Sequence, residues 1–200
     1  MSPSRYRVRS LFRGAVTHVA TALHRRGVRP NTITYLTVLL AIVAMLTLVL
    51  TNSEPLYGLF VFLMGFFDGV DGAIARNAGI ASRTGALTDS VLDKVSESIV
   101  LAAIALAHLT DVVLGLSVSI WVLVCLASWL LTSYTRARAE SLDVTDLDVG
   151  VGARSERLLT LVAFSLLTLL LLGLVIVTLM GILTAAYRYQ HYKDQIDITT

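Results

Sequence analysis

The sequence predicts an all-α integral membrane protein with six transmembrane helices and an N-terminal amphipathic juxtamembrane helix. Three observations lead to this fold class. Hydrophobic residues make up 56% of the 200 residues, and the mean hydropathy of +0.76 is above that of a soluble domain. The apolar residues form long runs separated by short polar links, and Lys and Arg gather at alternate links. One membrane domain accommodates all of these runs.

Residues 1–29 form the predicted juxtamembrane segment on the cytoplasmic side. The segment is rich in arginine, and apolar residues recur at roughly helical spacing: Leu11, Phe12, Val16, Val19, Ala20 and Leu23. A basic amphipathic helix of this kind lies on an anionic membrane surface. The same arginines also fit a plain anchor for the first span, and both interpretations stay open.

The membrane domain is predicted to cover residues 30–193, followed by a polar tail at 194–200. We place its apolar runs at 32–51, 56–76, 84–107, 113–135 and 158–187. The last run is too long for one helix and short for two. Gly173 near its middle predicts a tight hairpin of two shorter spans, which brings the total to six.

The basic residues predict the orientation. With six spans and the N-terminus inside, the external links lie near residues 52–55, 108–112 and 173, and none of them contains Lys or Arg. All 16 basic residues then lie on the cytoplasmic side, in agreement with the positive-inside rule. We therefore expect a multi-pass protein of the cell membrane with both termini in the cytoplasm.

Four carboxylates and an arginine interrupt the second and third runs. The chain reads Asp68-Gly69-Val70-Asp71-Gly72-Ala73-Ile74-Ala75-Arg76, then eight residues, Gly85, three residues, Asp89, three residues and Asp93. Charged groups are costly within a membrane unless they pair or bind a metal, so a functional site is the default interpretation. The alternative is a pair of salt bridges to Arg76 and Lys94, which would leave charge uncompensated because four acids face two bases.

Helical geometry would bring these carboxylates together. Asp68 and Asp71 lie about 60° apart around one helix, and Asp89 and Asp93 are one turn apart on the next. Oxygen ligands without histidine or thiolate suit hard cations such as Mg²⁺ or Mn²⁺. Two carboxylates from each helix predict a two-metal site of the kind that stabilises displacement at phosphorus. The site lies at the cytoplasmic ends of its helices in the predicted topology.

The pattern resembles the signature of the CDP-alcohol phosphatidyltransferases, Asp-x2-Asp-Gly-x2-Ala-Arg-x8-Gly-x3-Asp-x3-Asp, and matches it at every fixed position. The resemblance implies a homodimeric enzyme that transfers a phosphatidyl-type group from CDP-diacylglycerol or CDP-archaeol to an alcohol and releases CMP. It implies Mg²⁺ or Mn²⁺, two ions, held by Asp68, Asp71 and Asp89. It assigns the general base to Asp93, with a further metal ligand as the alternative role of that residue.

The resemblance also implies a donor site. The cytidine would lie over Gly72 and Ala75, and Arg76 would pair with phosphate. The run Pro30-Asn31-x-x-Thr34 resembles the start of the family's first helix, where polar groups approach the nucleotide, although simple capping also explains it. The implied donor-binding residues are Asn31, Thr34, Asp68, Gly72, Ala75, Arg76 and Gly85.

Two later segments bear on the acceptor. Tyr134-Thr135-Arg136-Ala137-Arg138-Ala139-Glu140 and Gly152-Ala153-Arg154-Ser155-Glu156-Arg157-Leu158 resemble the branch that makes phosphatidylinositol phosphate, or its archaeal ether-lipid counterpart, from inositol 1-phosphate. Ala153 and Ser155 depart from the Glu and Pro usual in that branch. A cluster of arginines suits a dianionic acceptor, and the predicted phosphate-binding set is Arg136, Arg138, Arg154, Arg157 and Arg188. Positive-inside arginines without a ligand are the alternative.

Two other functions compete with this interpretation. Glycerol 3-phosphate is also phosphorylated, so a phosphatidylglycerophosphate-type synthase is the nearest rival. An ion or proton transporter is a rival from another class, because intramembrane carboxylates also mark ion pathways. The carboxylates gather at one end of the predicted bundle instead of along a route across it, which disfavours transport. The basic residues are explained by orientation and acceptor, so no nucleic-acid partner is predicted.

Overall fold

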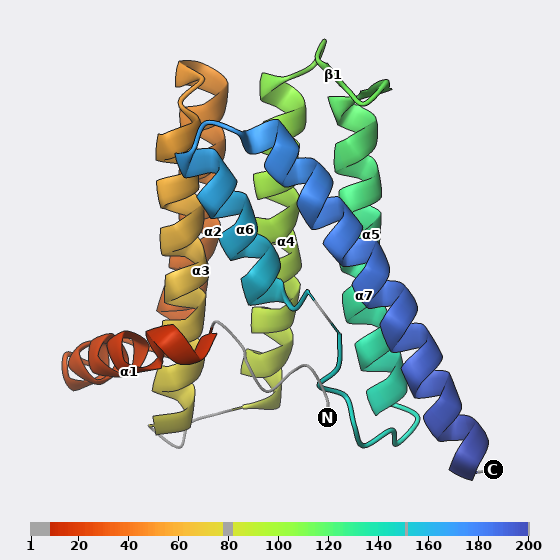
Figure 1. The fold of residues 1–200 in the computed structure, drawn as a ribbon. Coiled ribbons are helices and arrows are strands. Elements are labelled where there is room, and N and C mark those ends of the chain that lie inside the picture. Colours follow the sequence, from red (N-terminus) through yellow and green to blue (C-terminus); the bar gives the residue numbers. More distant parts are fainter. Residues whose placement is uncertain (1–8, 78–81, 151, 200) are drawn as a thin grey trace.

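The computed structural model describes residues 9–77, 82–150 and 152–199. The described residues form seven helices and one two-stranded hairpin (Figure 1). The helices are α1 (Arg9–Arg25), α2 (Pro30–Thr51), α3 (Glu54–Asn77), α4 (Arg83–Ala107), α5 (Val118–Glu140), α6 (Arg154–Leu166) and α7 (Leu170–Thr199). Strands β1 (Val112–Val113) and β2 (Leu116–Ser117) pair antiparallel between α4 and α5. The predicted all-α class is confirmed.

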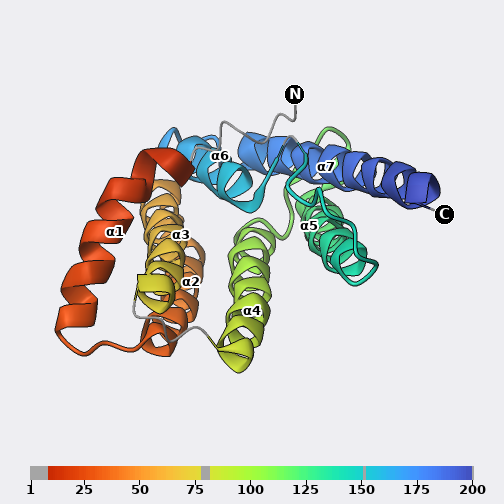
Figure 2. The same ribbon diagram turned by 90° about the horizontal axis from the view of Figure 1, so that it is seen from below.

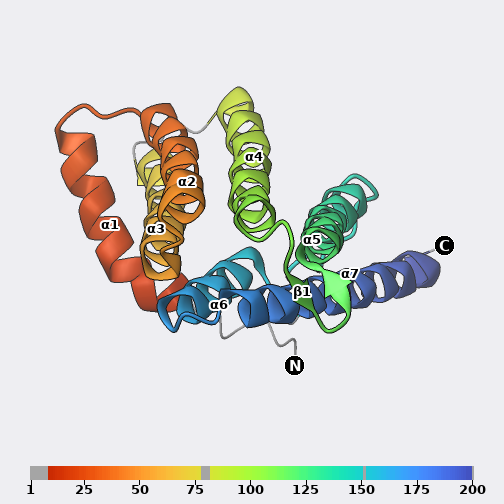
Figure 3. The ribbon, with the colours of Figure 1, turned by 90° about the horizontal axis from the view of Figure 1, so that it is seen from above.

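Helix α4 stands in the middle of the bundle. Seen from below, α2 and α3 lie on one side of it and α5 lies on the other, while α6 and α7 run along one edge (Figure 2). The view from above shows the same order, with the β1–β2 hairpin next to α5 and α7 (Figure 3). Helix α2 packs against α3 and α4, α3 packs against α6, and α5 packs against α7. The bundle therefore places α3, α4 and α6 around one space.

Four of the described helices, α2, α3, α5 and α7, are long and apolar enough to cross a membrane. Helix α4 has 25 residues, but its first 15 residues include the charged residues Asp89, Asp93, Lys94 and Glu97. Helix α6 has 13 residues, or about 20 Å, against about 30 Å of hydrocarbon. The structure is that of a multi-helix membrane protein in which four spans are clear.

The last apolar run is divided, but the predicted position of the turn is wrong. Helix α6 ends at Leu166 and α7 begins at Leu170, and Thr168 between them takes a left-handed φ of 57°. Gly173 lies inside α7, where a Cβ atom would come within 2.6 Å of the Phe164 Cβ. The glycine permits close packing of α6 and α7 and does not interrupt the helix. Helix α7 is consequently a long helix of 30 residues and not a short span.

Three other boundaries also differ from the prediction. Residues 112–117 form the hairpin, so the fourth span does not begin at 113 but at Val118, where the Ser117 side chain caps the helix. At its other end α5 continues to Glu140, beyond the predicted end at residue 135, so Arg136 and Arg138 are helical. Helix α7 likewise runs on through most of the predicted polar tail. Helix-forming residues after the apolar run carry both helices beyond the membrane limits that hydropathy suggests.

Helix α1 lies across the lower end of the bundle, at a large angle to α3 (Figure 1). Val16 and Ala20 on its apolar face pack with Val70 and Ile74 of α3, and Val16 comes to within 3.5 Å of where a Gly69 Cβ would lie. The predicted helix is therefore present, and part of its apolar face is covered by protein. Its binding to the membrane surface stays a prediction.

Gly58 brings α3 and α6 together. A Cβ atom at this position would lie 2.7 Å from the Ser165 Cβ and 3.3 Å from the Val162 carbonyl oxygen. We expect Gly58→Ala to lower the free energy of unfolding by about 1–3 kcal/mol, measured by thermal unfolding in detergent. Gly14→Ala in α1 is the control, because nothing lies within 4 Å of its Cβ position. An equal loss in both variants would contradict the packing explanation.

Candidate active site

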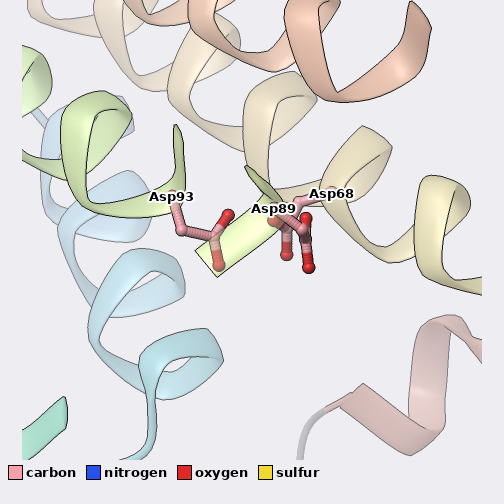
Figure 4. Close-up of side chains that lie close together, drawn as sticks. All are labelled: Asp68, Asp89 and Asp93. Carbon is pink, nitrogen blue, oxygen red and sulfur yellow. The ribbon is translucent and has the colours of Figure 1, made fainter. Parts of the chain in front are cut away.

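Three aspartates converge where α3 faces α4. Asp68 comes from α3, and Asp89 and Asp93 come from one face of α4 (Figure 4). One carboxylate oxygen from each residue lies within 4.8 Å of the others. The predicted convergence of the two halves of the motif is thus confirmed for these three residues.

This arrangement fits a divalent metal ion. Carboxylate oxygens are the ligands that Mg²⁺ and Mn²⁺ prefer. Neighbouring ligands around such an ion are about 3 Å apart, so small changes of side-chain rotamer would bring all three oxygens to one ion. All three side chains are half-buried, which limits competition from bulk water.

Asp71 is held in a different way. It is 3% exposed, its Oδ2 accepts a hydrogen bond from the Thr34 hydroxyl at 2.9 Å, and its Oδ1 accepts one from the Gly72 amide. It is not a member of the group of three close carboxylates, although it interacts electrostatically with Asp68 and Asp89. Its role as a metal ligand stays a prediction. The contact with Thr34 does bring the start of α2 to the motif.

Arg154, at the start of α6, lies across the carboxylates. Its Nη1 pairs with the Asp68 carboxylate at 2.5 Å, its Nη2 with Asp93 at 2.9 Å and its Nε with Glu97 at 2.7 Å. The guanidinium therefore uses all three nitrogens on acidic partners from α3 and α4. Sequence reasoning placed Arg154 among the acceptor arginines and missed this pairing with the motif.

Glu97 was also missed. It is 1% exposed, and while its Oε1 receives Arg154, its Oε2 accepts from Lys94 Nζ at 2.7 Å. The signal was present in the sequence, because Asp89, Asp93 and Glu97 follow one another at intervals of four residues. Such spacing keeps side chains on one helix face, so the acidic face of α4 extends one turn beyond the motif.

Two of the predicted acceptor arginines are buried. Arg157 is 1% exposed and lies over the Trp129 ring, with 4.6 Å between its Cζ and the ring centroid. Its Nε and Nη1 have no hydrogen-bond partner among the described residues. Arg188 of α7 donates from Nε to the Val149 carbonyl at 3.0 Å and from Nη1 to the Thr132 carbonyl at 2.7 Å.

The other two arginines of the set lie nearer to the surface. Arg136 Nη1 pairs with Asp148 at 2.9 Å, and both side chains are exposed. Arg138 is exposed as well and donates to the Ser141 hydroxyl at 3.3 Å. Asp148 belongs to the connection between α5 and α6, so this connection contacts both Arg136 and, through Val149, Arg188.

A cavity of about 1270 Å³ joins these groups. It is lined by residues of α1, α3, α4, α5, α6 and α7, among them Asp68 and Asp93. Four of the five predicted acceptor arginines also line it, namely Arg136, Arg154, Arg157 and Arg188, whereas Arg138 does not. Its remaining walls include apolar side chains such as Phe62, Phe66 and Leu158. A polar end beside apolar walls suits an amphiphilic substrate.

The predicted donor residues lie at the starts of α2 and α4 and the end of α3. A Cβ atom at Gly85 would be 4.0 Å from the Asn31 amide oxygen, so these two residues are neighbours. Gly72 and Ala75 are half-buried on α3. The Arg76 side chain lies outside the described residues, and its pairing with phosphate stays a prediction.

Known proteins resemble this chain in sequence and in structure. Residues 28–187 match the model of the CDP-alcohol phosphatidyltransferase family. The archaetidylinositol phosphate synthase of Pyrococcus horikoshii is 27% identical over 194 residues, which cover 96% of this chain and 98% of the relative. The phosphatidylinositol phosphate synthase of Streptomyces avermitilis is 37% identical over 153 residues, 75% of this chain and 61% of the relative.

The fold agrees with a solved enzyme. The crystal structure of Mycobacterium tuberculosis phosphatidylinositol phosphate synthase with CDP-DAG bound has a TM-score of 0.75 and 26% identity, and the match covers 88% of this chain and 92% of that one. A second structure of that enzyme, in complex with manganese and citrate, also has a TM-score of 0.75, with 25% identity and 88% coverage of both chains. The chain is therefore a membrane-bound transferase that belongs to the CDP-alcohol phosphatidyltransferase family.

Proposed function

We propose that this enzyme transfers a phosphatidyl-type group from a CDP-activated lipid to inositol 1-phosphate and releases CMP. The observation that carries the proposal is one cavity that is lined by Asp68 of α3, Asp93 of α4 and four arginines. A carboxylate cluster can hold a cation that binds the pyrophosphate of the donor, while arginines can bind a second, separate phosphate directly. The named activities of the Pyrococcus and Streptomyces relatives support inositol phosphate as the acceptor.

The donor side follows from the motif. Asp68, Asp71, Asp89 and Asp93 would hold Mg²⁺ or Mn²⁺, two ions in the complete site, and a bound ion neutralises charge on the pyrophosphate. The cytidine of CDP-diacylglycerol or CDP-archaeol would lie over Gly72 and Ala75. Asn31, Thr34, Arg76 and Gly85 would surround it. CDP-DAG in the Mycobacterium tuberculosis enzyme, and manganese in its second structure, support this assignment.

Asp93 is the proposed general base. Its carboxylate takes the proton of an acceptor hydroxyl, the hydroxyl oxygen attacks the lipid-side phosphorus, and CMP leaves with the bonding electron pair. Asp93 lines the cavity and is 2.9 Å from Arg154. The base is therefore next to the arginines that would bind the acceptor phosphate.

Arg136, Arg154, Arg157 and Arg188 are the proposed acceptor-binding residues. Arg157 has the strongest support, since a buried donor without a partner is rare and an anion would satisfy it. Arg138 completes the predicted set but has the weakest support, because it is exposed and does not line the cavity.

We also propose that α4 and α6 complete six transmembrane helices and that both termini and the active site face the cytoplasm. The connections at the upper end of the bundle, residues 52–53, 108–117 and 167–169, contain no Lys or Arg (Figure 1). The positive-inside rule places such connections outside the cell. A homodimer is the assembly that the family resemblance suggests.

The acceptor can be tested directly. Purified protein is incubated with CDP-diacylglycerol or CDP-archaeol, Mg²⁺, and either inositol 1-phosphate or glycerol 3-phosphate, and CMP and the lipid product are followed by mass spectrometry. We expect CMP release that depends on inositol 1-phosphate. Release with glycerol 3-phosphate alone would keep the transfer reaction and overturn the acceptor. No release with either acceptor would contradict the proposed function.

A further inference from the structure

Arg154 pairs with carboxylates that a metal ion would need. It pairs with Asp68 and Asp93, two of the three aspartates whose oxygens lie within 4.8 Å of one another. Nη1 is 2.5 Å from Asp68 Oδ2 and Nη2 is 2.9 Å from Asp93 Oδ1, so the guanidinium holds one oxygen of each of these two carboxylates. A divalent ion and a guanidinium at the same carboxylates would also repel each other strongly in a half-buried site.

The third contact of Arg154 does not compete with a metal ion. Glu97 receives Nε of Arg154 on one oxygen and Lys94 on the other, and it is not a member of the group of three close aspartates. The guanidinium therefore has two ends with different partners. One end, Nη1 and Nη2, lies at the aspartates, and the other, Nε, is fixed to a buried carboxylate on α4.

The charge balance explains why a cation is needed here before metal binds. Asp68, Asp89, Asp93 and Glu97 bring four carboxylates to one site, where Arg154 pairs with three of them and Lys94 pairs with Glu97. Arg154 offsets part of the repulsion between these carboxylates, which is costly in a half-buried site.

We propose that Arg154 is an exchangeable counter-cation: it neutralises Asp68 and Asp93 in the metal-free enzyme, and divalent metal displaces its Nη1–Nη2 end while Glu97 retains Nε. Metal and Arg154 therefore compete for the same carboxylates. The inference rests on the metal site of the proposed function but not on the identity of the acceptor. In the complete reaction, the displaced Nη atoms face the cavity and become available to the acceptor phosphate.

Mn²⁺ binding tests the competition without turnover. Free Mn²⁺ is measured by electron paramagnetic resonance during titration of the metal-free protein in detergent. We expect Arg154→Met to bind Mn²⁺ about tenfold or more tightly than the unaltered protein, because a competing positive charge is gone. Mn²⁺ should also raise the Tm of this variant more than that of the unaltered protein. If Arg154→Met does not fold, Arg154→Gln carries the same expectation.

Two matched variants distinguish direct competition at the aspartates from a general effect of removing positive charge. Lys94→Met removes a neighbouring cation that pairs with Glu97 and not with the aspartates, and Arg25→Met removes an exposed one on α1. We expect Lys94→Met to raise Mn²⁺ affinity less than Arg154→Met does, and Arg25→Met to leave it unchanged. Equal gains for Arg154→Met and Lys94→Met would overturn the proposal, as would unchanged or weaker binding in Arg154→Met.

The Mn²⁺ affinity of Asp89→Asn tests the metal site separately from the competition with Arg154. If this substitution lowers Mn²⁺ affinity but Arg154→Met does not raise it, the metal site exists and the competition is wrong. If Asp89→Asn leaves Mn²⁺ binding unchanged, the ion binds elsewhere, and both the metal site and the competition are refuted. The acceptor assay above is independent of either result.

Discussion

Asp93→Asn is expected to lower kcat by about 10²–10⁴-fold, the range that a positioned general base contributes. Asparagine has nearly the same shape and keeps an oxygen that can accept from Arg154, but it cannot take the proton of the acceptor hydroxyl. The site should therefore stay assembled while the chemical step slows. CMP release with saturating donor and acceptor measures the effect.

The same variant distinguishes the two roles considered for Asp93. If the residue acts as base in addition to any contact with the metal, kcat should fall far more than Mn²⁺ affinity; a parallel fall in both would instead identify a metal ligand alone. Asp111→Asn is the control, since the same substitution is made in an exposed residue beyond the far end of α4, where its partner is His108. A comparable loss of kcat in Asp111→Asn would contradict a specific role for Asp93.

Arg157→Met is expected to raise the KM for inositol 1-phosphate by about 10- to 100-fold, which corresponds to the loss of one or two charge-assisted hydrogen bonds. Methionine fills similar space beside Trp129 but donates nothing to a phosphate. The KM for the CDP-activated lipid should hardly change, because Arg157 is not among the residues assigned to the donor. Initial rates at varied concentrations of each substrate measure both values.

The Tm of Arg157→Met tests whether the charge of Arg157 stabilises the fold or binds a ligand. If its charge serves only the fold, Arg157→Met should lower Tm and change both KM values alike. If its charge is kept for a ligand, Tm should be maintained or raised, because a buried guanidinium whose Nε and Nη1 lack partners among the described residues is costly in the absence of an anion. Inorganic phosphate should then raise the Tm of the unaltered protein more than that of the variant.

Much of this architecture could be predicted from hydropathy and spacing. The long apolar runs predict α2 and α3 closely, and the motif predicts that Asp68 of α3 meets Asp89 and Asp93 of α4. These features depend on helical periodicity and on the cost of charge in lipid, both of which are visible along the chain.

Features that depend on contacts between distant segments were harder to predict. Gly173 was interpreted as a turn, since a glycine that breaks a helix and one that admits Phe164 have the same local sequence. Arg154 was interpreted as a ligand for phosphate alone, because nothing in its own segment indicates that α6 brings it to Asp68 and Asp93. The regular spacing of acidic residues that ends at Glu97 is visible in the sequence, and Lys94, one partner of Glu97, lies only three residues away. The other partner, Arg154, lies 57 residues away on α6 and could not be predicted from the spacing.

The shortness of α6 has a consequence for the bilayer around the enzyme. A helix of 13 residues falls about 10 Å short of the hydrocarbon thickness, and its charged first residue, Arg154, marks where it stops. If α6 is one of the six proposed spans, lipid beside it would thin, or water would enter, to meet that end. The membrane surface would then be depressed next to the aspartates, and a lipid headgroup could reach them by lateral diffusion while its tails stay in the bilayer.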